Sequence, residues 1–242
     1  MKAKTDWFTS WFDTPFYHIL YKDRDDTDAR IFMQNITSFL ELKANTHILD
    51  LACGKGRHSV FLNSLGYKVT GADLSENSIE FANTFANQNL SFVEHDMRNP
   101  LVNKYNAIFN LFTSFGYFED DNEDIKVLQN IKNALKENGI AVIDFLNVFD
   151  VKKNLVENEV KSIDGIDFNI TRKIENGFII KEISFTADNE QHSFIERVKY
   201  LDKEKFTLYF QKAELKVQHV FGDYQLSKFD KETSKRLIFV VS

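Results

Sequence analysis

The sequence has few of the residues and segments that indicate a cross-linked, metal-bound or membrane-embedded protein. It contains one cysteine, Cys53, which excludes an internal disulfide framework and a CxxC metal site. No apolar run is long enough to span a membrane, and the first residues lack the apolar segment of a secretory signal. The formal net charge of −6 is not that of a dedicated DNA- or RNA-binding protein. We therefore expect a soluble, cytoplasmic protein without a nucleic-acid or membrane partner.

The histidines do not form a pattern that is typical of metal ligands. The 6 histidines show no H-x-x-x-H spacing and no pairing with cysteine, so we predict no metal site. The chain also lacks repeats and low-complexity linkers. Its length suits one medium domain with an insertion, or two small domains.

The most informative stretch of the sequence runs over residues 47–81. Ile48, Leu49 and Leu51 form a short apolar run, which is typical of a buried strand in a parallel sheet. Asp50 lies inside this run. Because a buried carboxylate is costly unless it accepts hydrogen bonds, we expect a donor near the end of the strand.

A glycine-rich turn, a helix and a second strand follow, and together they predict a nucleoside site. Gly54 and Gly56 allow a ligand to approach the backbone closely, and Gly66 can end the helix. The second strand begins at Val69 and ends at Asp73. This acid lies about 20 residues beyond the glycines, the spacing at which nucleotide-binding α/β folds place a carboxylate on the ribose hydroxyls.

The glycine pattern bears on which nucleoside is bound. A dinucleotide site favours G-x-G-x-x-G, but Ser59 stands at the third position here. A methyl donor such as S-adenosylmethionine has no pyrophosphate and needs room for its amino-acid part instead. The run from Asp50 to Gly56 matches D-x-x-C-G-x-G. With this motif the chain resembles the class I S-adenosylmethionine-dependent methyltransferases that act on small molecules.

The resemblance implies roles for residues at the ends of the predicted strands. Asp50 and the glycine backbone would hold the methionine end of the donor, and Asp73 would bind the ribose hydroxyls. Asp96 would accept from the adenine amino group, while the Met97 amide would donate to a ring nitrogen. S-adenosylmethionine is thus the expected cofactor and S-adenosylhomocysteine the product. The cofactor-binding residues predicted in this way are Asp50, Ala52, Cys53, Gly54, Gly56, Asp73, Leu74, Asp96, Met97, Asn110 and Tyr21.

In the rest of the chain, predicted strands alternate with predicted helices, as is typical of a doubly wound α/β fold. Further strands are predicted at 90–94, 105–112, 140–146, 217–224 and 237–241, and helices at 29–40, 75–86, 124–137 and 203–215. The resemblance implies a Rossmann-like, seven-stranded sheet whose last strand is antiparallel.

After the fifth strand the composition changes to that of antiparallel hairpins. Asp164-Gly165 and Asn176-Gly177 favour two-residue type I′ turns between runs in which apolar residues alternate with period two. We therefore predict a small inserted antiparallel sheet. Its apolar face must cover something. A cap on the pocket and a homodimer contact both stay open.

The predicted core comprises residues 1–153 and 203–242, and the inserted sheet residues 154–202. Residues 6–22 are rich in aromatic side chains and either pack on the flank of the core or form a lid over the active site. The resemblance favours a lid, because many small-molecule methyltransferases carry one near the methionine end. No residue is clearly a general base. The weak candidates for a catalytic role are Tyr17, His18 and Tyr117.

The segment after the fourth strand restricts the acceptor. Residues 110–117 lack the prolines of the Asn/Asp-Pro-Pro-Tyr/Phe motif found in enzymes that methylate planar amines, and Cys53 is misplaced for a cytosine C5 nucleophile. We therefore predict methyl transfer to an oxygen or nitrogen of a small-molecule acceptor. An NAD-dependent oxidoreductase on a similar fold and an RNA methyltransferase are the alternatives.

Overall fold

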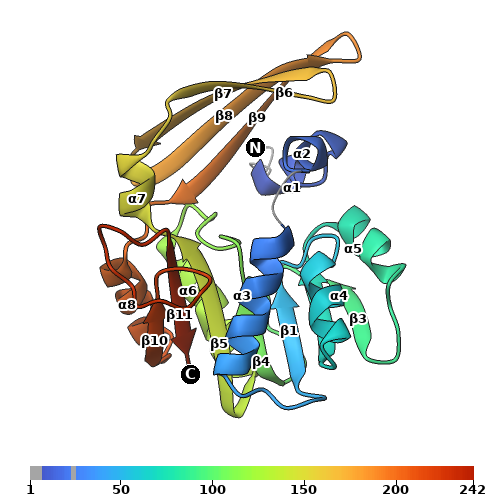
Figure 1. Cartoon of the computed structure of the whole chain (residues 1–242), viewed down its shortest axis with the longest axis vertical. Coiled ribbons are helices and arrows are strands. Elements are labelled where there is room, and N and C mark those ends of the chain that lie inside the picture. Colours follow the sequence, from blue (N-terminus) through green and yellow to red (C-terminus); the bar gives the residue numbers. More distant parts are fainter. Residues whose placement is uncertain (1–6, 23–25) are drawn as a thin grey trace. The chain divides into compact units, whose positions relative to one another are not determined.

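Two compact units make up the chain in the computed structural model. The model describes residues 7–22 and 26–242, so residue 6 of the aromatic segment lies outside the described residues. The larger unit comprises residues 25–150 and 201–242, and the smaller unit residues 1–24 and 151–200 (Figure 1). The contacts thus group the N-terminal segment with the inserted sheet, whereas the predicted division placed residues 1–153 in the core.

A seven-stranded sheet forms the centre of the larger unit. β1 pairs in parallel with both β2 and β4, whereas β11 runs antiparallel to β5. The predicted Rossmann-like sheet with an antiparallel last strand is therefore confirmed. In spatial order the strands are β10 (Val217–Phe221), β11 (Arg236–Val241), β5 (Leu135–Leu146), β4 (Tyr105–Asn110), β1 (His47–Leu51), β2 (Lys68–Asp73) and β3 (Leu90–Glu94).

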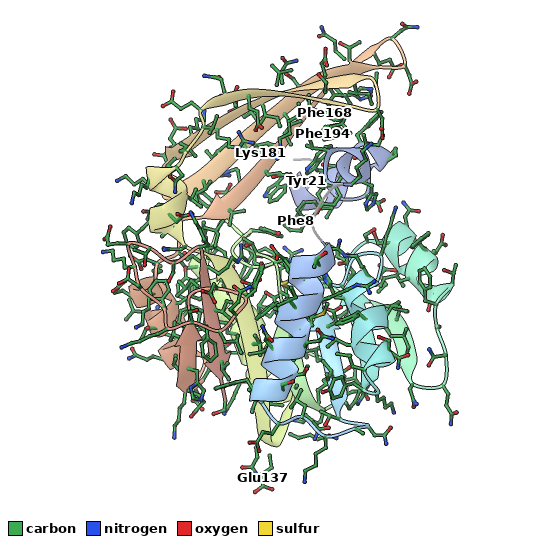
Figure 2. The ribbon with its side chains drawn as sticks, in the orientation of Figure 1. Phe8, Tyr21, Glu137, Phe168, Lys181 and Phe194 are labelled. Carbon is green, nitrogen blue, oxygen red and sulfur yellow. The ribbon has the colours of Figure 1, made fainter. Side chains whose placement is uncertain are left out.

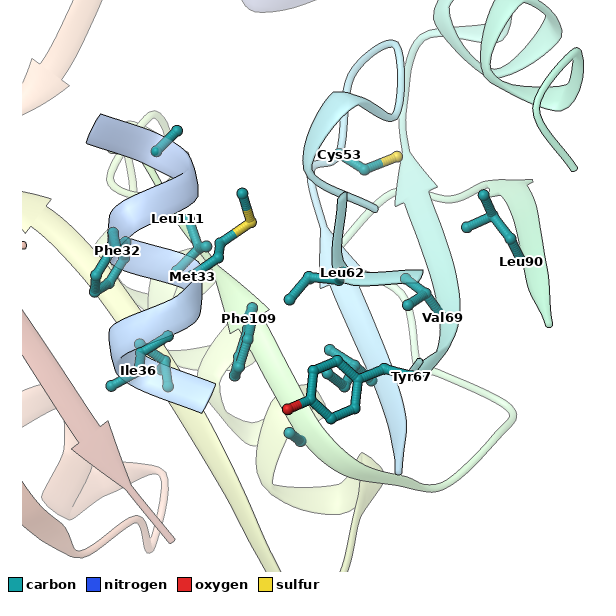
Figure 3. Packing of buried hydrophobic residues seen from close by; sticks show 14 of the residues in the cluster. Phe32, Met33, Ile36, Cys53, Leu62, Tyr67, Val69, Leu90, Phe109 and Leu111 are labelled. Atoms are coloured by element: carbon teal, nitrogen blue, oxygen red, sulfur yellow. The ribbon is translucent and has the colours of Figure 1, made fainter. Parts of the chain in front are cut away.

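Helices cover both faces of this sheet. Side chains of α3 (Asp26–Phe39), α4 (Arg57–Ser64) and α5 (Glu76–Asn83) share one buried cluster with the strands, in which Phe32 and Leu62 lie near Phe109 (Figure 3). The other helices are α6 (Asp121–Ala134) and α8 (Lys203–Lys212). The Phe206 ring of α8 lies 5.1 Å from the ring of Phe145 in β5 and 5.1 Å from that of Phe239 in β11. Two hydrophobic layers therefore enclose the sheet, as expected for a doubly wound fold.

The connection between α6 and β5 differs from its prediction. The helix ends at Ala134, three residues before the predicted end, because Leu135 is already extended and pairs with Tyr105. The next pair joins Ala107 to Ile140, so residues 136–139 form an irregularity inside β5 rather than the end of a helix.

A four-stranded antiparallel sheet forms the smaller unit. Its turns at Asp164-Gly165 and Asn176-Gly177 have positive φ angles at both positions, as type I′ turns require, so these two turns are confirmed. A third turn, at residues 188–189, has the same signs. The strands are β6 (Asn158–Ile163), β7 (Ile166–Glu175), β8 (Phe178–Ala187) and β9 (Glu190–Lys199), and the helix α7 (Val148–Lys153) precedes them.

The aromatic segment at the N-terminus packs on this sheet. It forms the short helices α1 (Trp7–Trp11) and α2 (Pro15–Leu20). The Trp11 ring lies 4.5 Å from that of Phe194, and the Phe16 ring 4.8 Å from that of Phe185. Figure 2 labels Phe168 and Phe194 on the sheet and Tyr21 after α2. Within the smaller unit, these helices therefore cover the apolar face of the sheet.

Over residues 7–22 and 26–242, no helix combines the length and the apolar character that crossing a membrane requires.

Candidate functional site

The carboxyl end of β1 carries a buried acid. Asp50 is 2% exposed, and its Oδ2 accepts a 2.6 Å hydrogen bond from the hydroxyl of Ser59 in the first turn of α4. The expected donor is thus present, and it is the residue that replaces the third glycine of a dinucleotide motif. Burial, with a smaller contribution from the charge of Asp73, raises the pKa of Asp50 to about 6.

The turn after β1 is shaped by backbone that glycine favours. Gly54 and Gly56 have φ angles of +53° and +79°, and Ala52 also lies in the left-handed region. A Cβ on Gly56 would lie 2.5 Å from the Phe92 ring, so this glycine also allows close packing against β3. Burial raises the pKa of the Cys53 thiol, which is therefore protonated and unreactive at neutral pH.

The carboxyl end of β2 lies against this turn. Asp73 Oδ2 accepts a 2.7 Å hydrogen bond from the Gly54 amide, and Oδ1 accepts a 2.9 Å bond from the Ser75 amide. Ser75 then caps the start of α5 (Glu76–Asn83), because its hydroxyl accepts a hydrogen bond from the Ser78 amide. Leu74 lies between these residues. The acid predicted to bind ribose thus also joins the glycine turn to the start of α5.

The acid after β3 is paired with an arginine. The Arg98 guanidinium donates to both carboxylate oxygens of Asp96, with the shortest contact at 2.7 Å. Partial burial acts to raise the pKa of Asp96, but the hydrogen bonds and the charge of Arg98 outweigh it and lower that pKa. The carbonyl of Met97 accepts a 3.0 Å bond from the Asn130 amide group.

The end of β4 presents an unsatisfied acceptor. Asn110 is fully buried, and its Nδ2 donates to the carbonyl oxygens of Leu51 (3.0 Å) and Ser114 (3.3 Å). Its Oδ1 is buried without a hydrogen-bond partner among the described residues. Because native structures rarely leave such an atom unsatisfied, this oxygen marks a place for a donor from a ligand. It lies where the strand order reverses, between β1 and β4, as ligand sites in these folds do.

The catalytic candidates divide between the two units. In the larger unit, the Tyr117 hydroxyl donates a 2.6 Å hydrogen bond to the Thr113 carbonyl. In the smaller unit, the Tyr17 ring lies 5.3 Å from the His18 ring. Tyr21 donates to Glu196 of β9 at 2.6 Å. A cofactor contact of Tyr21 and catalysis by Tyr17, His18 or Tyr117 stay predictions.

Two residues at this end of the sheet were not assigned by the sequence. Asp144 in β5 is fully buried, and Arg236 in β11 donates to it at 2.8 Å. Each is the one polar side chain in an apolar run of the sequence, residues 140–146 for Asp144 and residues 236–241 for Arg236, and this was the available signal. The described residues bring together no group of three histidine, cysteine or acidic side chains able to hold a metal ion.

The site suits a ligand that carries positive charge and hydrogen-bond donors. Asp50 and Asp73 are close enough for each charge to disfavour the other, and a cation beside them would relieve this repulsion. The unpartnered Oδ1 of Asn110 would accept from an ammonium group. S-adenosylmethionine offers a sulfonium and an ammonium, and a ribose with two hydroxyls. The residues at the ends of β1, β2 and β4 therefore fit this cofactor.

These features define a doubly wound α/β protein, and comparison with known proteins makes the class narrower. Residues 42–207, more than half of the chain, match the methyltransferase domain family. Over 108 residues the chain is 33% identical to "Putative methyltransferase YqeM" from Bacillus subtilis (strain 168). That match covers 43% of this chain and 44% of the relative, so the chain spans less than half of the relative's length.

Solved structures share the fold over nearly the whole chain. An S-adenosylmethionine-dependent methyltransferase from Clostridium acetobutylicum ATCC 824 has a TM-score of 0.79 at 21% identity, and the match covers 94% of this chain and 95% of that one. The S-adenosylmethionine-bound CalS10, an amino pentose methyltransferase from Micromonospora echinaspora, has a TM-score of 0.69 at 17% identity and covers 94% and 96%. The chain therefore belongs to the methyltransferase domain family, and the predicted class of S-adenosylmethionine-dependent methyltransferases is confirmed.

Proposed function

We propose that this protein transfers a methyl group from S-adenosylmethionine to an oxygen or nitrogen of a small molecule, with S-adenosylhomocysteine as the product. The observation that carries the proposal is the unpartnered, buried Oδ1 of Asn110 beside the acids at the ends of β1 and β2. CalS10, which acts on an amino pentose, supports a small-molecule acceptor, as does the net charge of −6.

The residues of the larger unit would bind each part of the cofactor separately. Asn110 Oδ1 would accept from the ammonium, and Asp50 would supply negative charge beneath the glycine turn. Asp73 would accept from the ribose hydroxyls, and Asp96, held by Arg98, from the adenine amino group. When bound, the cofactor supplies a methyl group that its sulfonium already activates. The protein then contributes proximity and alignment of the acceptor lone pair with the methyl carbon.

Binding calorimetry with S-adenosylmethionine, and NAD as the parallel ligand, tests this proposal. We expect micromolar binding of S-adenosylmethionine and none of NAD. Asp73→Asn should weaken binding about 10- to 100-fold, because hydrogen bonds from ribose to a charged acceptor are lost. Glu80→Gln, at an exposed position on α5, is the matched control and should bind like the wild type. Binding of NAD alone would contradict the proposal and favour an oxidoreductase.

A further inference from the structure

Two polar side chains lie diagonally across the paired strands β5 and β11, because Arg236 is opposite Leu146 and Asp144 is opposite Ile238. Asp144 has a fully buried side chain, and that of Arg236 is 19% exposed. The guanidinium donates a 2.8 Å hydrogen bond from Nε to Asp144 Oδ1, and a terminal nitrogen lies 2.8 Å from the same oxygen in the ion pair. Such a pair is costly to bury, so its presence in an apolar sheet calls for a reason other than stability.

The turn that follows β4 has a backbone that its side chains disfavour. Phe112 and Thr113 have φ angles of +58° and +65°, in the left-handed region. That region is unfavourable for a bulky residue and more so for a β-branched one, and such residues keep it only where the surroundings impose it. Two consecutive residues of this kind therefore require external support.

The ion pair supplies that support. Asp144 Oδ2 accepts a 2.8 Å hydrogen bond from the Phe112 amide, and the Asp144 carbonyl accepts a 3.0 Å bond from the Thr113 amide. Arg236 donates a 3.0 Å bond to the hydroxyl of Thr113. Both amides of the turn and the threonine side chain are thus bonded to Asp144 or Arg236.

The supported turn in turn orients Asn110. Its amide nitrogen donates to the carbonyl of Ser114, directly after the strained pair, and to Leu51 at the end of β1. Because both of these partners are carbonyls, the nitrogen of the amide must face them, and Oδ1 is left without a partner. A change in the turn would move Ser114 and release this orientation.

We propose that Asp144 and Arg236 are positioning residues for the amino-acid end of the methyl donor. Their ion pair holds the left-handed turn at residues 112–113, and the turn holds Asn110 Oδ1 toward the donor's ammonium. Neither residue contacts the cofactor itself. The inference rests on the proposed function. It adds which residues determine the affinity for the amino-acid end of the donor without affecting the affinity for its nucleoside end.

Two ligands that differ only at that end give the test. S-adenosylhomocysteine carries the ammonium and carboxylate, whereas 5′-methylthioadenosine carries the same nucleoside without them. Calorimetry of Asp144→Asn should show at least a tenfold loss of affinity for S-adenosylhomocysteine and less than a threefold loss for methylthioadenosine. Asp150→Asn is the matched control, because it removes the ion pair of Asp150 with Lys235, the neighbour of Arg236, and should change neither affinity.

Further variants keep the test decisive. Asn110→Ala should give the same selective loss of affinity. Combining it with Asp144→Asn should add little further loss, because Asp144 acts on the ligand through the orientation of Asn110. If Asp144→Asn does not fold, Arg236→Lys replaces it, since lysine keeps the charge but cannot bond Asp144 and Thr113 with a planar fork. Equal losses for both ligands, or no loss, would overturn the inference while leaving the proposed function intact. A wild-type protein that binds neither ligand would overturn the proposed function itself.

Discussion

The buried carboxyl group of Asp50 lowers the stability of the free protein when it is ionised, although its charge would favour binding of a cationic ligand. Its folded-state pKa of about 6 lies above the ordinary value of 3.8, so ionising it in the folded protein is unfavourable. The resulting decrease in the free energy of unfolding is absent below about pH 4, grows as the pH rises to about 6 and is complete above about pH 6. A shift of this size corresponds to roughly 3 kcal/mol, since each pKa unit is worth about 1.4 kcal/mol.

Asp50→Asn should therefore stabilise the free protein at high pH. Asparagine keeps an acceptor for Ser59 and carries no charge, so the free energy of unfolding at pH 8 should rise by about 2–3 kcal/mol. At pH 4 the variant and the wild type should be equally stable. Urea denaturation at the two pH values measures this, with Glu80→Gln as the control. A gain that is the same at both pH values would contradict the argument, and cofactor affinity at pH 8 should fall.

Single residues of the site were predictable only where a local pattern exists. The strand, the glycine turn and their spacing to Asp73 predicted where these acids would lie, and burial in a strand predicted a donor for Asp50. The pairing of Arg236 with Asp144 was not predicted, because the two residues are 92 positions apart and no local sequence pattern connects them. The orientation of Asn110 likewise depends on Leu51, 59 positions earlier in the chain.

At the scale of elements, α1 and α2 depend on the sheet that they cover. They have 5 and 6 residues, too few to be stable alone. Glu196 of β9 joins them to the sheet, because it accepts 2.7 Å and 2.6 Å hydrogen bonds from Trp11 Nε1 and the Tyr21 hydroxyl. Lys181 of β8 lies 3.7 Å from the same carboxylate and contacts the Tyr21 hydroxyl (Figure 2).

Glu196→Gln should weaken the docking of these two helices. The amide oxygen can still accept from Trp11 and Tyr21, but both hydrogen bonds lose the charge that strengthens them, and the carboxylate beside Lys181 is removed. We expect these losses to cost about 2 kcal/mol. Amide hydrogen exchange in residues 7–22 should then accelerate more than tenfold. Glu182→Gln is the control. The exposed ion pair of Glu182 with Lys173 contributes little to stability, so amide exchange in residues 7–22 should not change in this variant. Unchanged exchange in Glu196→Gln would mean that ring packing alone holds the helices.

The sequence predicted hairpins better than it predicted what they pack against. Asp164-Gly165 and Asn176-Gly177 determine their turns by themselves, because both positions of a type I′ turn need residues that tolerate positive φ. The end of α6 was displaced by a pairing between Leu135 and Tyr105, which no local propensity encodes. The helices that cover the inserted sheet, α1 and α2, are separated from it in the sequence by all the elements from α3 to α7, so no local pattern predicts this packing.

At the scale of the whole molecule, the division into two units predicts two unfolding events. The tryptophans, Trp7 and Trp11, both belong to the smaller unit, so their fluorescence reports on that unit alone. Every predicted cofactor residue except Tyr21 belongs to the larger unit. A ligand stabilises the unit that binds it, by about 2.7 kcal/mol at 100 times its dissociation constant.

S-adenosylhomocysteine should therefore raise the Tm of the larger unit, measured by calorimetry. An unchanged fluorescence transition would mean that no residue of the smaller unit holds the ligand. If Tyr21 contacts the cofactor, as predicted, the fluorescence transition should rise as well. A single transition, coincident by both methods with and without ligand, would contradict independent unfolding of the two units.

The separation of Trp11 from Glu196 by 185 positions also has a consequence for synthesis on the ribosome. The aromatic helices are made before the sheet, which at about 5–20 residues per second follows roughly 10–40 s later. During that interval their apolar side chains have no native partner. The nascent chain thus presents an aromatic segment to chaperones while residues 25–199 are translated.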